Sequence, residues 1–327
     1  MRPHADRERG ASLLSVLVIV MLMSAAAVAA TDALARSVAI AKSSGARAET
    51  FWTARGAASA AAPYMSKALE ATGAQLNDTS DLFARQITLP AGHGLVTMDV
   101  REASNCFNLN ALLDDPGSAA VADGALGAYA DLLVAAGFNI GEAESLAAKL
   151  ADWIDSDSST RTYGAENGYY ASLSEPYRTA GWRLRAVSEL KSIAGYDEDG
   201  VLARILPLVC LRPGVEASVL NVNTLTPDQA ALLAGLFSAE LTTADARALI
   251  ESRPISGWPD IETFLAEPAI ERIAPDARHD DRVSVASSFF AANIDIGTGD
   301  LATSYRALYA RTEGAGVSLV SLVRRDF

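Results

Sequence analysis

The stretch of the chain best suited to chemistry is acidic and lies between residues 151 and 167. Asp152 and Asp155 are three residues apart, so both carboxylates are expected on one face of a helix that ends near Ser156. Asp157 follows directly, where the last carbonyl groups of a helix also point outward. Carboxylates this close together repel one another unless a cation lies among them. Because no Cys or His is nearby, these hard oxygen ligands favour Ca²⁺ over zinc or copper.

The spacing of these acids resembles an EF-hand calcium loop without matching it. Positions 1, 3, 5 and 12 of such a loop would be Asp155, Asp157, Ser159 and Glu166. Position 6, where the loop needs glycine for its sharp turn, is Thr160. The residues alone leave two interpretations open. One is a calcium site that is not an EF-hand, and the other is an acidic helix end followed by a solvated Ser/Thr loop.

Known catalytic motifs are missing from the sequence. It has no Gly-x-Ser-x-Gly, no Gly-rich phosphate loop and no His-Glu-x-x-His. The three histidines are isolated from one another at His4, His93 and His279. Two of the carboxylates could act as acid and base in a glycosidase, but no cluster of aromatic residues flanks them. We therefore expect a protein that is not an enzyme.

The elements that must carry these acids begin with a charge pattern at the N-terminus. Arg2, Arg7 and Arg9 precede a run of 22 uncharged residues from Gly10 to Thr31. As a helix this run spans roughly 33 Å, enough to cross the hydrocarbon core of a bilayer. The arginines lie on one side only, so the N-terminus is expected in the cytoplasm and the rest of the chain in the periplasm. A cleaved secretory signal is the rival interpretation, since residues 25–30 contain several alanines.

The short basic leader, the glycine and the apolar run together resemble the leader of type IV pilin-like proteins. In that class a dedicated peptidase cuts after the glycine, here between Gly10 and Ala11, and the new amine is methylated. Most members carry a glutamate five residues into the mature chain, where this sequence has Ser15. This departure points to the one subunit type that commonly lacks the glutamate.

Hydrophobic periodicity predicts the remaining elements. Residues 32–73 are expected to continue the membrane helix as a single rod, since their alanine-rich pattern is interrupted only by Gly45, Gly56 and Pro63. Residues 108–280 are almost wholly helical in pattern. Strands are expected on both sides of that region, over residues 86–89, 95–102, 283–296, 303–311 and 317–324. The predicted fold is α+β: a long N-terminal transmembrane and amphipathic helix packs on a small antiparallel sheet, and a large all-α domain is inserted in the sheet.

Charge and cysteine content limit the classes of partner and compartment. The net charge of −13 repels phosphate backbones, so no nucleic-acid ligand is expected. The chain has two cysteines, Cys106 and Cys210. If most of the chain is periplasmic, they can form a disulfide that stabilises the fold by constraining the unfolded chain. Two buried free thiols are the alternative.

Residues 221–235 look like the opening of a helix-hairpin-helix unit (SAM-like). Thr224 or Thr226 can cap its helix, and Pro227 suits the first turn. DNA-binding hairpins of this kind carry a second glycine and basic neighbours. Here Gly235 is followed by Leu and Phe, and the residues beyond are mostly acidic. We therefore expect a copy of the motif that serves packing only.

Six strings of residues, in this order, carry a specific family resemblance. They are residues 105–112 (Asn-Cys-Phe-Asn-Leu-Asn-Ala-Leu), 152–157 (Asp-Trp-Ile-Asp-Ser-Asp), 164–166 (Gly-Ala-Glu), 176–180 (Pro-Tyr-Arg-Thr-Ala), 187–190 (Val-Ser-Glu-Leu) and 221–224 (Asn-Val-Asn-Thr). With the leader and Ser15, the sequence resembles the K-type minor pseudopilins of the type II secretion system over nearly its whole length. It departs from the family at residues 181–183, where members often have Asn-x-Pro.

The resemblance implies a tip subunit of the periplasmic pseudopilus. Such a subunit joins I- and J-type minor pseudopilins and, through them, the H-type and major pseudopilins, and is processed by prepilin peptidase. The family also binds calcium in the inserted domain. Carried onto matching positions, the implied ligands are Asp152, Asp155, Asp157, Glu166 and Asn167.

The expected organisation divides the chain into five parts. These are a leader, residues 1–10; a single span of the inner membrane, 11–31; a pilin-like N-terminal part, 32–107; the helical insertion, 108–280; and the C-terminal strands, 281–327. The expected function is to initiate and cap pseudopilus assembly for protein secretion. Two alternatives remain: a membrane-anchored periplasmic helix-hairpin-helix protein of DNA uptake, and a membrane-anchored exported hydrolase. A basic hairpin face would favour the first alternative, and a catalytic constellation the second.

Overall fold

The computed structural model describes residues 5–72, 75–77, 79–91, 94–115, 120–237, 240–298, 301–312, 314 and 316–325. The chain forms two compact units, Met1–Gly56 and Ala57–Phe327. The sheet and the helical lobe, defined here as residues 108–280, both belong to the second unit.

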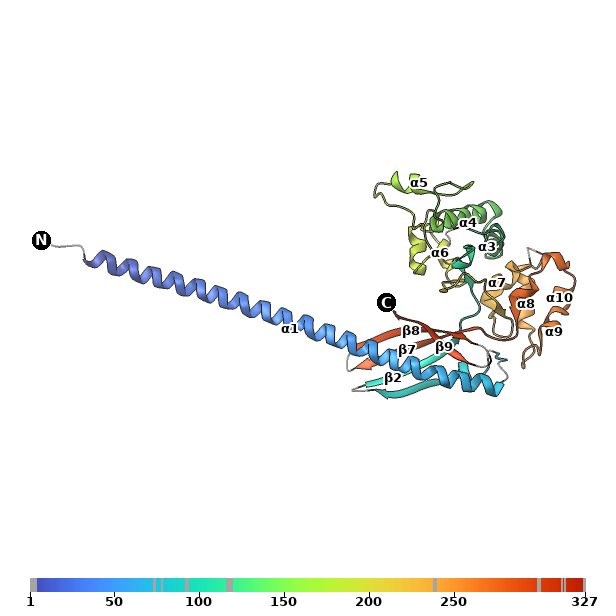
Figure 1. The fold of residues 1–327 in the computed structure, drawn as a ribbon, viewed down its shortest axis with the longest axis horizontal. Helices are drawn as coiled ribbons and strands as arrows, with labels where there is room; N and C mark the ends of the chain where they lie inside the picture. The colour runs from blue at the N-terminus through green and yellow to red at the C-terminus, as the bar shows by residue number, and fades with distance from the viewer. Residues whose placement is uncertain are drawn as a thin grey trace. The chain divides into compact units, whose positions relative to one another are not determined.

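One helix dominates the N-terminal part of the chain. Helix α1 (Ala5–Thr72) is continuous for 68 residues (Figure 1). The expected continuation of the membrane helix is confirmed through residue 72, and Gly45, Gly56 and Pro63 all lie inside the helix. Among the described residues it is the one helix long and apolar enough to cross a membrane. Its leucines, valines and isoleucines between Leu13 and Val28 are exposed, which suits a bilayer and not water.

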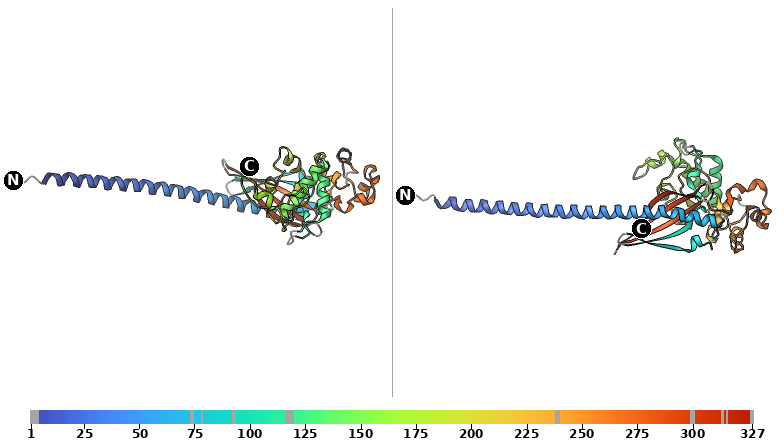
Figure 2. Two further views of the ribbon diagram at one scale, coloured as in Figure 1. Left: turned by 90° about the horizontal axis from the view of Figure 1, so that it is seen from above. Right: turned by 60° about the horizontal axis from the view of Figure 1, so that its bottom comes forward.

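The sheet has five antiparallel strands in the order β1-β2-β7-β8-β9. The bounds are Gln86–Ala91, Gly94–Glu102, Phe289–Thr298, Leu301–Arg311 and Val317–Arg325. The C-terminal part of α1 lies along one face, as the views of Figures 1 and 2 agree. Ala58, Ala61, Met65 and Leu69 of this part are buried. The Tyr309 hydroxyl of β8 donates a hydrogen bond of 2.8 Å to the Ala58 carbonyl, which joins strand and helix.

The strand expected over residues 283–296 is wrong in one respect, because the structure breaks it in two. Strand β6 (Val283–Ser284) pairs in parallel with β5 (Leu220–Asn221), and β7 begins only at Phe289. Between them, side chains replace the strand ladder. Ser287 donates to Glu102 and accepts from the Asn221 amide, and the Ser288 N–H donates to the Ser104 hydroxyl. The pattern of apolar residues could not reveal these long-range bonds.

The helical lobe contains short helices joined by long irregular segments. Its two short strands, β4 (Val209–Cys210) and β5, were not expected from the helical pattern; β4 pairs in parallel with β3 (Phe107–Asn108). The helices are α3 (Asp123–Ala135), α4 (Ile140–Ile154), α5 (Asn167–Ala171), α6 (Val201–Ile205), α7 (Ala230–Gly235), α8 (Thr243–Glu251), α9 (Ile261–Leu265) and α10 (Pro268–Glu271). The 3₁₀ turns are η1 (Leu109–Leu112), η2 (Val187–Ser192), η3 (Pro227–Gln229), η4 (Pro275–Ala277) and η5 (Asp280–Arg282).

Buried asparagines hold the irregular segments of the lobe in place. The Asn110 amide donates to the carbonyls of Leu184 and Arg212, each at 3.1 Å, and accepts from the Leu184 N–H at 2.9 Å. Similarly, the Asn223 amide donates a hydrogen bond to the Trp258 carbonyl and accepts one from the Trp258 N–H. These side chains supply the bonds that a regular ladder would otherwise provide. This explains why strings rich in asparagine stand at residues 105–110 and 221–223.

The unit that resembles a helix-hairpin-helix packs within the lobe. Of the two expected caps, Thr226 begins the turn η3, and its N–H donates to the Gln229 side chain. Thr224 is buried instead and accepts a hydrogen bond from the Asn105 amide. A Cβ at Gly235 would lie 3.0 Å from the Cα of Leu132, so this glycine lets α7 approach the α3 backbone closely.

Candidate metal centre

Helix α4 positions the first two acids. The Asn139 side chain caps its N-terminus by accepting a hydrogen bond of 2.9 Å from the Glu142 N–H. In return, the Glu142 carboxylate accepts a hydrogen bond from the Asn139 N–H. The apolar face of α4 is buried in the lobe, and its last turn carries Asp152 on that face. The helix ends at Ile154, close to the expected end, and Asp155 is its C-terminal cap. Packing of the apolar face thus carries both carboxylates into the interior.

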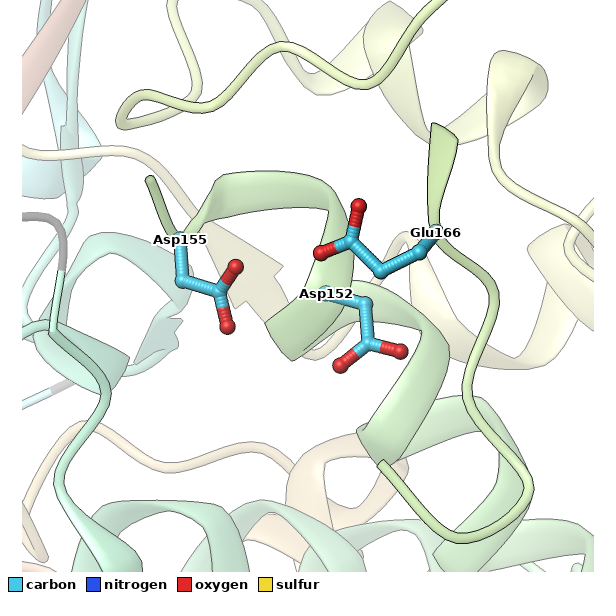
Figure 3. A group of neighbouring side chains, drawn as sticks. All are labelled: Asp152, Asp155 and Glu166. Carbon is cyan, nitrogen blue, oxygen red and sulfur yellow. The ribbon is translucent and has the colours of Figure 1, made fainter. Parts of the chain in front are cut away.

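Three carboxylates meet at this helix end. One oxygen from each of Asp152, Asp155 and Glu166 lies within 4.8 Å of the others. The relative exposures are 0%, 1% and 4%, so the cluster is closed to bulk water. Figure 3 shows the first two acids at the end of α4 and the third facing them from a separate segment. Among the described residues this is the one group of His, Cys, Asp and Glu side chains gathered closely enough to hold a metal ion.

One arginine partly neutralises the cluster. Arg161 Nη1 donates to Asp152 Oδ1 at 2.8 Å and to Asp155 Oδ2, and the Arg161 N–H donates to Asp152 Oδ2 at 3.2 Å. Glu166 Oε2 accepts the Asn167 N–H at 2.9 Å. Asp155 Oδ1 and Glu166 Oε1 are buried and have no hydrogen-bond partner. Three buried acids therefore face one guanidinium, and two of their oxygens remain unsatisfied.

Burial disfavours the charged forms of two of these acids. It raises the pKa of Asp155 above its ordinary value, against the hydrogen bond and charge of Arg161. Burial likewise raises the pKa of Glu166, opposed by its bond from the Asn167 backbone and reinforced by the charges of the two buried aspartates. A bound divalent cation would remove this cost, because it favours the ionised carboxylates.

Two of the residues expected as ligands lie outside the cluster. Asp157 is exposed, and its Oδ1 accepts the Ser159 N–H at 2.7 Å. The Asn167 amide oxygen accepts the N–H and hydroxyl of Thr179, at 3.1 and 3.3 Å. The structure thus brings together Asp152, Asp155 and Glu166 and not the full set of five. Residues at EF-hand positions 1 and 12 converge, whereas the residue at position 3 does not.

Sequence reasoning missed two residues of this site. Arg161 is a lone cation in an acidic loop, which is the signal that could have marked it. The other is Gly164, where a Cβ would collide with the Asp152 carboxylate. Glycine at this position lets the backbone of the returning loop pass directly over that carboxylate. The donor set contains only oxygen, which suits a hard cation such as Ca²⁺.

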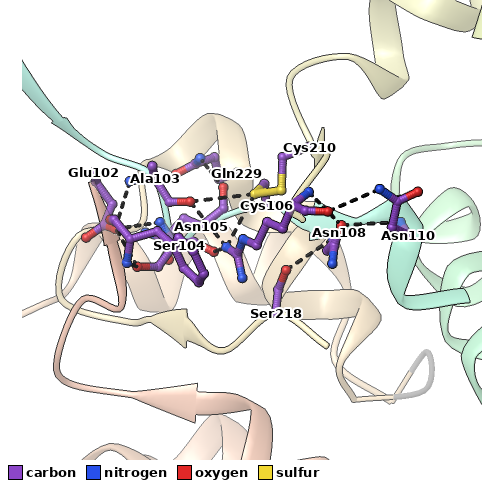
Figure 4. The surroundings of a disulfide bond; sticks show 12 residues. Glu102, Ala103, Ser104, Asn105, Cys106, Asn108, Asn110, Cys210, Ser218 and Gln229 are labelled. Carbon is purple, nitrogen blue, oxygen red and sulfur yellow. Dashed lines mark hydrogen bonds between the residues drawn. A yellow bond between two sulfur atoms is a disulfide. The ribbon is translucent and has the colours of Figure 1, made fainter. Parts of the chain in front are cut away.

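The two cysteines are joined. Cys106 and Cys210 form a disulfide with their Cα atoms 5.7 Å apart, across 104 residues of sequence. Cys106 directly precedes β3 and Cys210 ends β4, so the bond fastens the start of the lobe to a segment far along the chain. Figure 4 shows the surrounding hydrogen bonds, among them the one from the Gln229 amide to the Asn105 carbonyl.

The residues expected at the processing site lie within α1. Gly10 and Ala11 are helical, and the structure describes their backbone alone. Residues 1–4 of the expected leader lie outside the described residues.

Known proteins resemble this chain over most of its length. Two family models described as type II secretion system (T2SS), protein K, match residues 105–214 and 220–286. The type II secretion system protein K of Pectobacterium carotovorum subsp. carotovorum is 32% identical over 93% of this chain and 92% of its own length. The protein K of Klebsiella pneumoniae is 34% identical over 92% of both chains.

A solved structure extends the likeness to three dimensions. A chain in the crystal structure of the GspK-GspI-GspJ complex from the type 2 secretion system of enterotoxigenic Escherichia coli superimposes with a TM-score of 0.72. It is 26% identical, and the match covers 88% of this chain and 99% of that one. With most of the chain matched both in sequence and in fold, this chain belongs to the type II secretion system protein K family of minor pseudopilins.

Proposed function

We propose that this minor pseudopilin stands at the tip of the pseudopilus, in a complex with I- and J-type minor pseudopilins, and initiates and caps its assembly. The observation that carries the proposal is the match of helix, sheet and lobe to a chain solved within a GspK-GspI-GspJ complex. Through these two partners the tip joins the H-type and major pseudopilins. The family is a structural component of a secretion system, so the work is assembly and not catalysis.

The membrane end of the chain supports a place at the tip. Prepilin peptidase cuts after Gly10, and the new amine of Ala11 is methylated. The apolar part of α1 then anchors the chain in the inner membrane, with its basic leader in the cytoplasm and the remainder in the periplasm. A buried glutamate in the bilayer is costly without a partner. A tip subunit has no neighbour above it to provide that partner, which accounts for Ser15.

The lobe supports a structural calcium ion at the acidic cluster. Asp152, Asp155 and Glu166 supply the oxygens, and Asp155 Oδ1 and Glu166 Oε1 are the buried atoms that lack a partner. The ion joins the end of α4 to the segment that returns at Glu166. Asp157 and Asn167 are the further ligands expected from the family; in the structure Asp157 Oδ1 accepts from Ser159 and Asn167 Oδ1 accepts from Thr179. Calcium here stabilises the lobe and takes no part in a reaction.

Co-purification tests the proposed complex. The full-length chain, carrying an affinity tag, is expressed with I- and J-type pseudopilins and prepilin peptidase and extracted from membranes in detergent. We expect all three pseudopilins to elute together, and the mature chain to begin at Ala11. Recovery of the I–J pair without this chain would contradict the proposal. A Gly10→Leu variant is the control for the leader, since it should remain uncut.

A further inference from the structure

A basic cleft lies where the lobe meets the sheet, away from the acidic cluster. Its volume is about 490 Å³, and three arginines from separate segments of the chain line it. Arg185 precedes η2, Arg212 follows β4, and Arg306 lies on β8. The one acidic residue in the lining is Glu102. In a chain with a net charge of −13, a cleft lined by three arginines and one glutamate is a local reversal of sign.

The charges in the cleft are not compensated within the described chain. No carboxylate of the described residues lies within ion-pair distance of Arg185, Arg212 or Arg306. Glu102 is already engaged, because its oxygens accept from the N–H groups of Ala103 and Ser104 and from two hydroxyls. The arginines therefore have unused capacity to bind an anion.

Among the three arginines, Arg212 has the strongest need for an anion, because it is buried. Its relative exposure is 6%, its Nη2 donates to the carbonyls of Ala103 and Ser104, and its Nε has no partner. Its guanidinium lies 4.1 Å over the Phe289 ring. Burial lowers the pKa of Arg212 to about 10, against the opposing charges of Glu102 and Glu216. A buried cation without a counterion is costly, and an anion in the cleft would offset that cost.

The rim of the cleft fits a peptide better than a small anion. Leu206 and Val323 line it and are 43% and 60% exposed, so apolar groups stand beside the arginines. Val323 lies on β9, which pairs only with β8 among the described strands. An extended segment can lie along such an edge and place alternate side chains in the cleft. An occupant with both carboxylates and apolar side chains satisfies all of these features.

We propose that this cleft binds an extended acidic segment of a partner protein, with carboxylates on Arg185 and Arg306 and apolar side chains on Leu206 and Val323. The proposal does not depend on the tip assignment, because binding is measured on this chain alone. Co-purification tests the complex with I- and J-type pseudopilins, so the proposed function and the proposed cleft can fail independently.

Peptide binding tests the cleft on the full-length protein in detergent. The probe is a fluorescently labelled hexapeptide that alternates valine and glutamate, read by anisotropy, and its counterpart carries glutamine in place of glutamate. We expect the glutamate peptide to bind at least about tenfold more tightly. Arg185→Glu and Arg306→Glu should each weaken it by about tenfold, and neither should unfold the protein, because both arginines are exposed. Arg247→Glu, at an exposed residue of α8 that does not line the cleft, is the matched control and should leave binding unchanged.

Three results would overturn the proposal. The first is equal binding of both peptides, or binding insensitive to both charge reversals. The second is binding of inorganic phosphate without binding of the peptide, which would make the cleft a small-anion site. The third is self-association of the wild-type chain that Arg306→Glu abolishes, which would identify a second copy as the occupant.

Discussion

Residue types and spacing located part of the acidic site. Asp152 and Asp155 were expected on one helix face, and Glu166 at the far end of the loop, and these three carboxylates converge. The sequence did not predict Arg161 between them or the exposed position of Asp157, because both depend on how the loop folds back. That path is set by contacts remote in sequence, such as the bond from Thr179 to Asn167.

Removing a buried acid should abolish calcium-dependent stabilisation. With calcium at about one hundred times its Kd, the free energy of unfolding of the lobe should rise by about 2.7 kcal/mol. Asp155→Asn or Glu166→Gln should eliminate most of that gain, since each neutralises a carboxylate with a buried, unpartnered oxygen. Thermal unfolding of the full-length chain, in calcium and in chelator, measures this calcium-dependent gain in stability. Asp157→Asn is the matched control with a smaller loss, and equal losses in all three variants would argue against the cluster as the site.

The asparagines also act as single residues, and their loss should be costly. Asn110→Ala removes three hydrogen bonds and leaves the backbone groups of Leu184 and Arg212 unsatisfied in the interior. We expect a loss of about 3 kcal/mol in stability, measured by urea unfolding. Asn139→Ala, which removes an exposed helix cap, should cost about 1 kcal/mol. An Asn110 effect no larger than the Asn139 effect would refute the proposed role of these amides.

At the scale of elements, hydrophobic periodicity predicted the long regular strands and missed the short and interrupted ones. The hairpin over residues 86–102 and the last two strands were expected within two residues of their bounds. The break before β7 was missed, because Ser287 and Ser288 are held by side chains distant in sequence. The short strands β4 and β5 were missed as well. Two-residue pairings leave no periodic pattern to recognise.

The close approach of α7 to α3 gives a test at this scale. Gly235→Val would press a side chain against the Leu132 backbone, which cannot move aside as a flexible side chain can. We expect a loss of about 2 kcal/mol in the free energy of unfolding. Gly127→Ala, also in a helix of the lobe but with no atom within 4 Å of its Cβ, should instead stabilise by about 0.5 kcal/mol. Tolerance of valine at residue 235 would show that the two helices are not in contact as described.

At the scale of the whole molecule, the chain combines a long apolar helix with an α+β part that contains the sheet and the lobe. By length and composition the helix could cross a bilayer, and the sheet and lobe form the folded remainder. The order of elements, helix, two strands, helical insertion and three strands, followed from the sequence because each has a distinct hydrophobic period. The disulfide expected between Cys106 and Cys210 is present, whereas the asparagine bonds and the basic cleft could not be predicted from the sequence. They depend on which distant segments meet.

The place of this chain in the pseudopilus is the central claim, and counting its copies tests it most directly. Full-length chain with a single C-terminal tag is labelled with gold in isolated pseudopili, and label is counted by electron microscopy against filament length. We predict one label at one end of each filament, whatever its length. Label distributed along the shaft in proportion to length would show a repeating subunit and contradict the account.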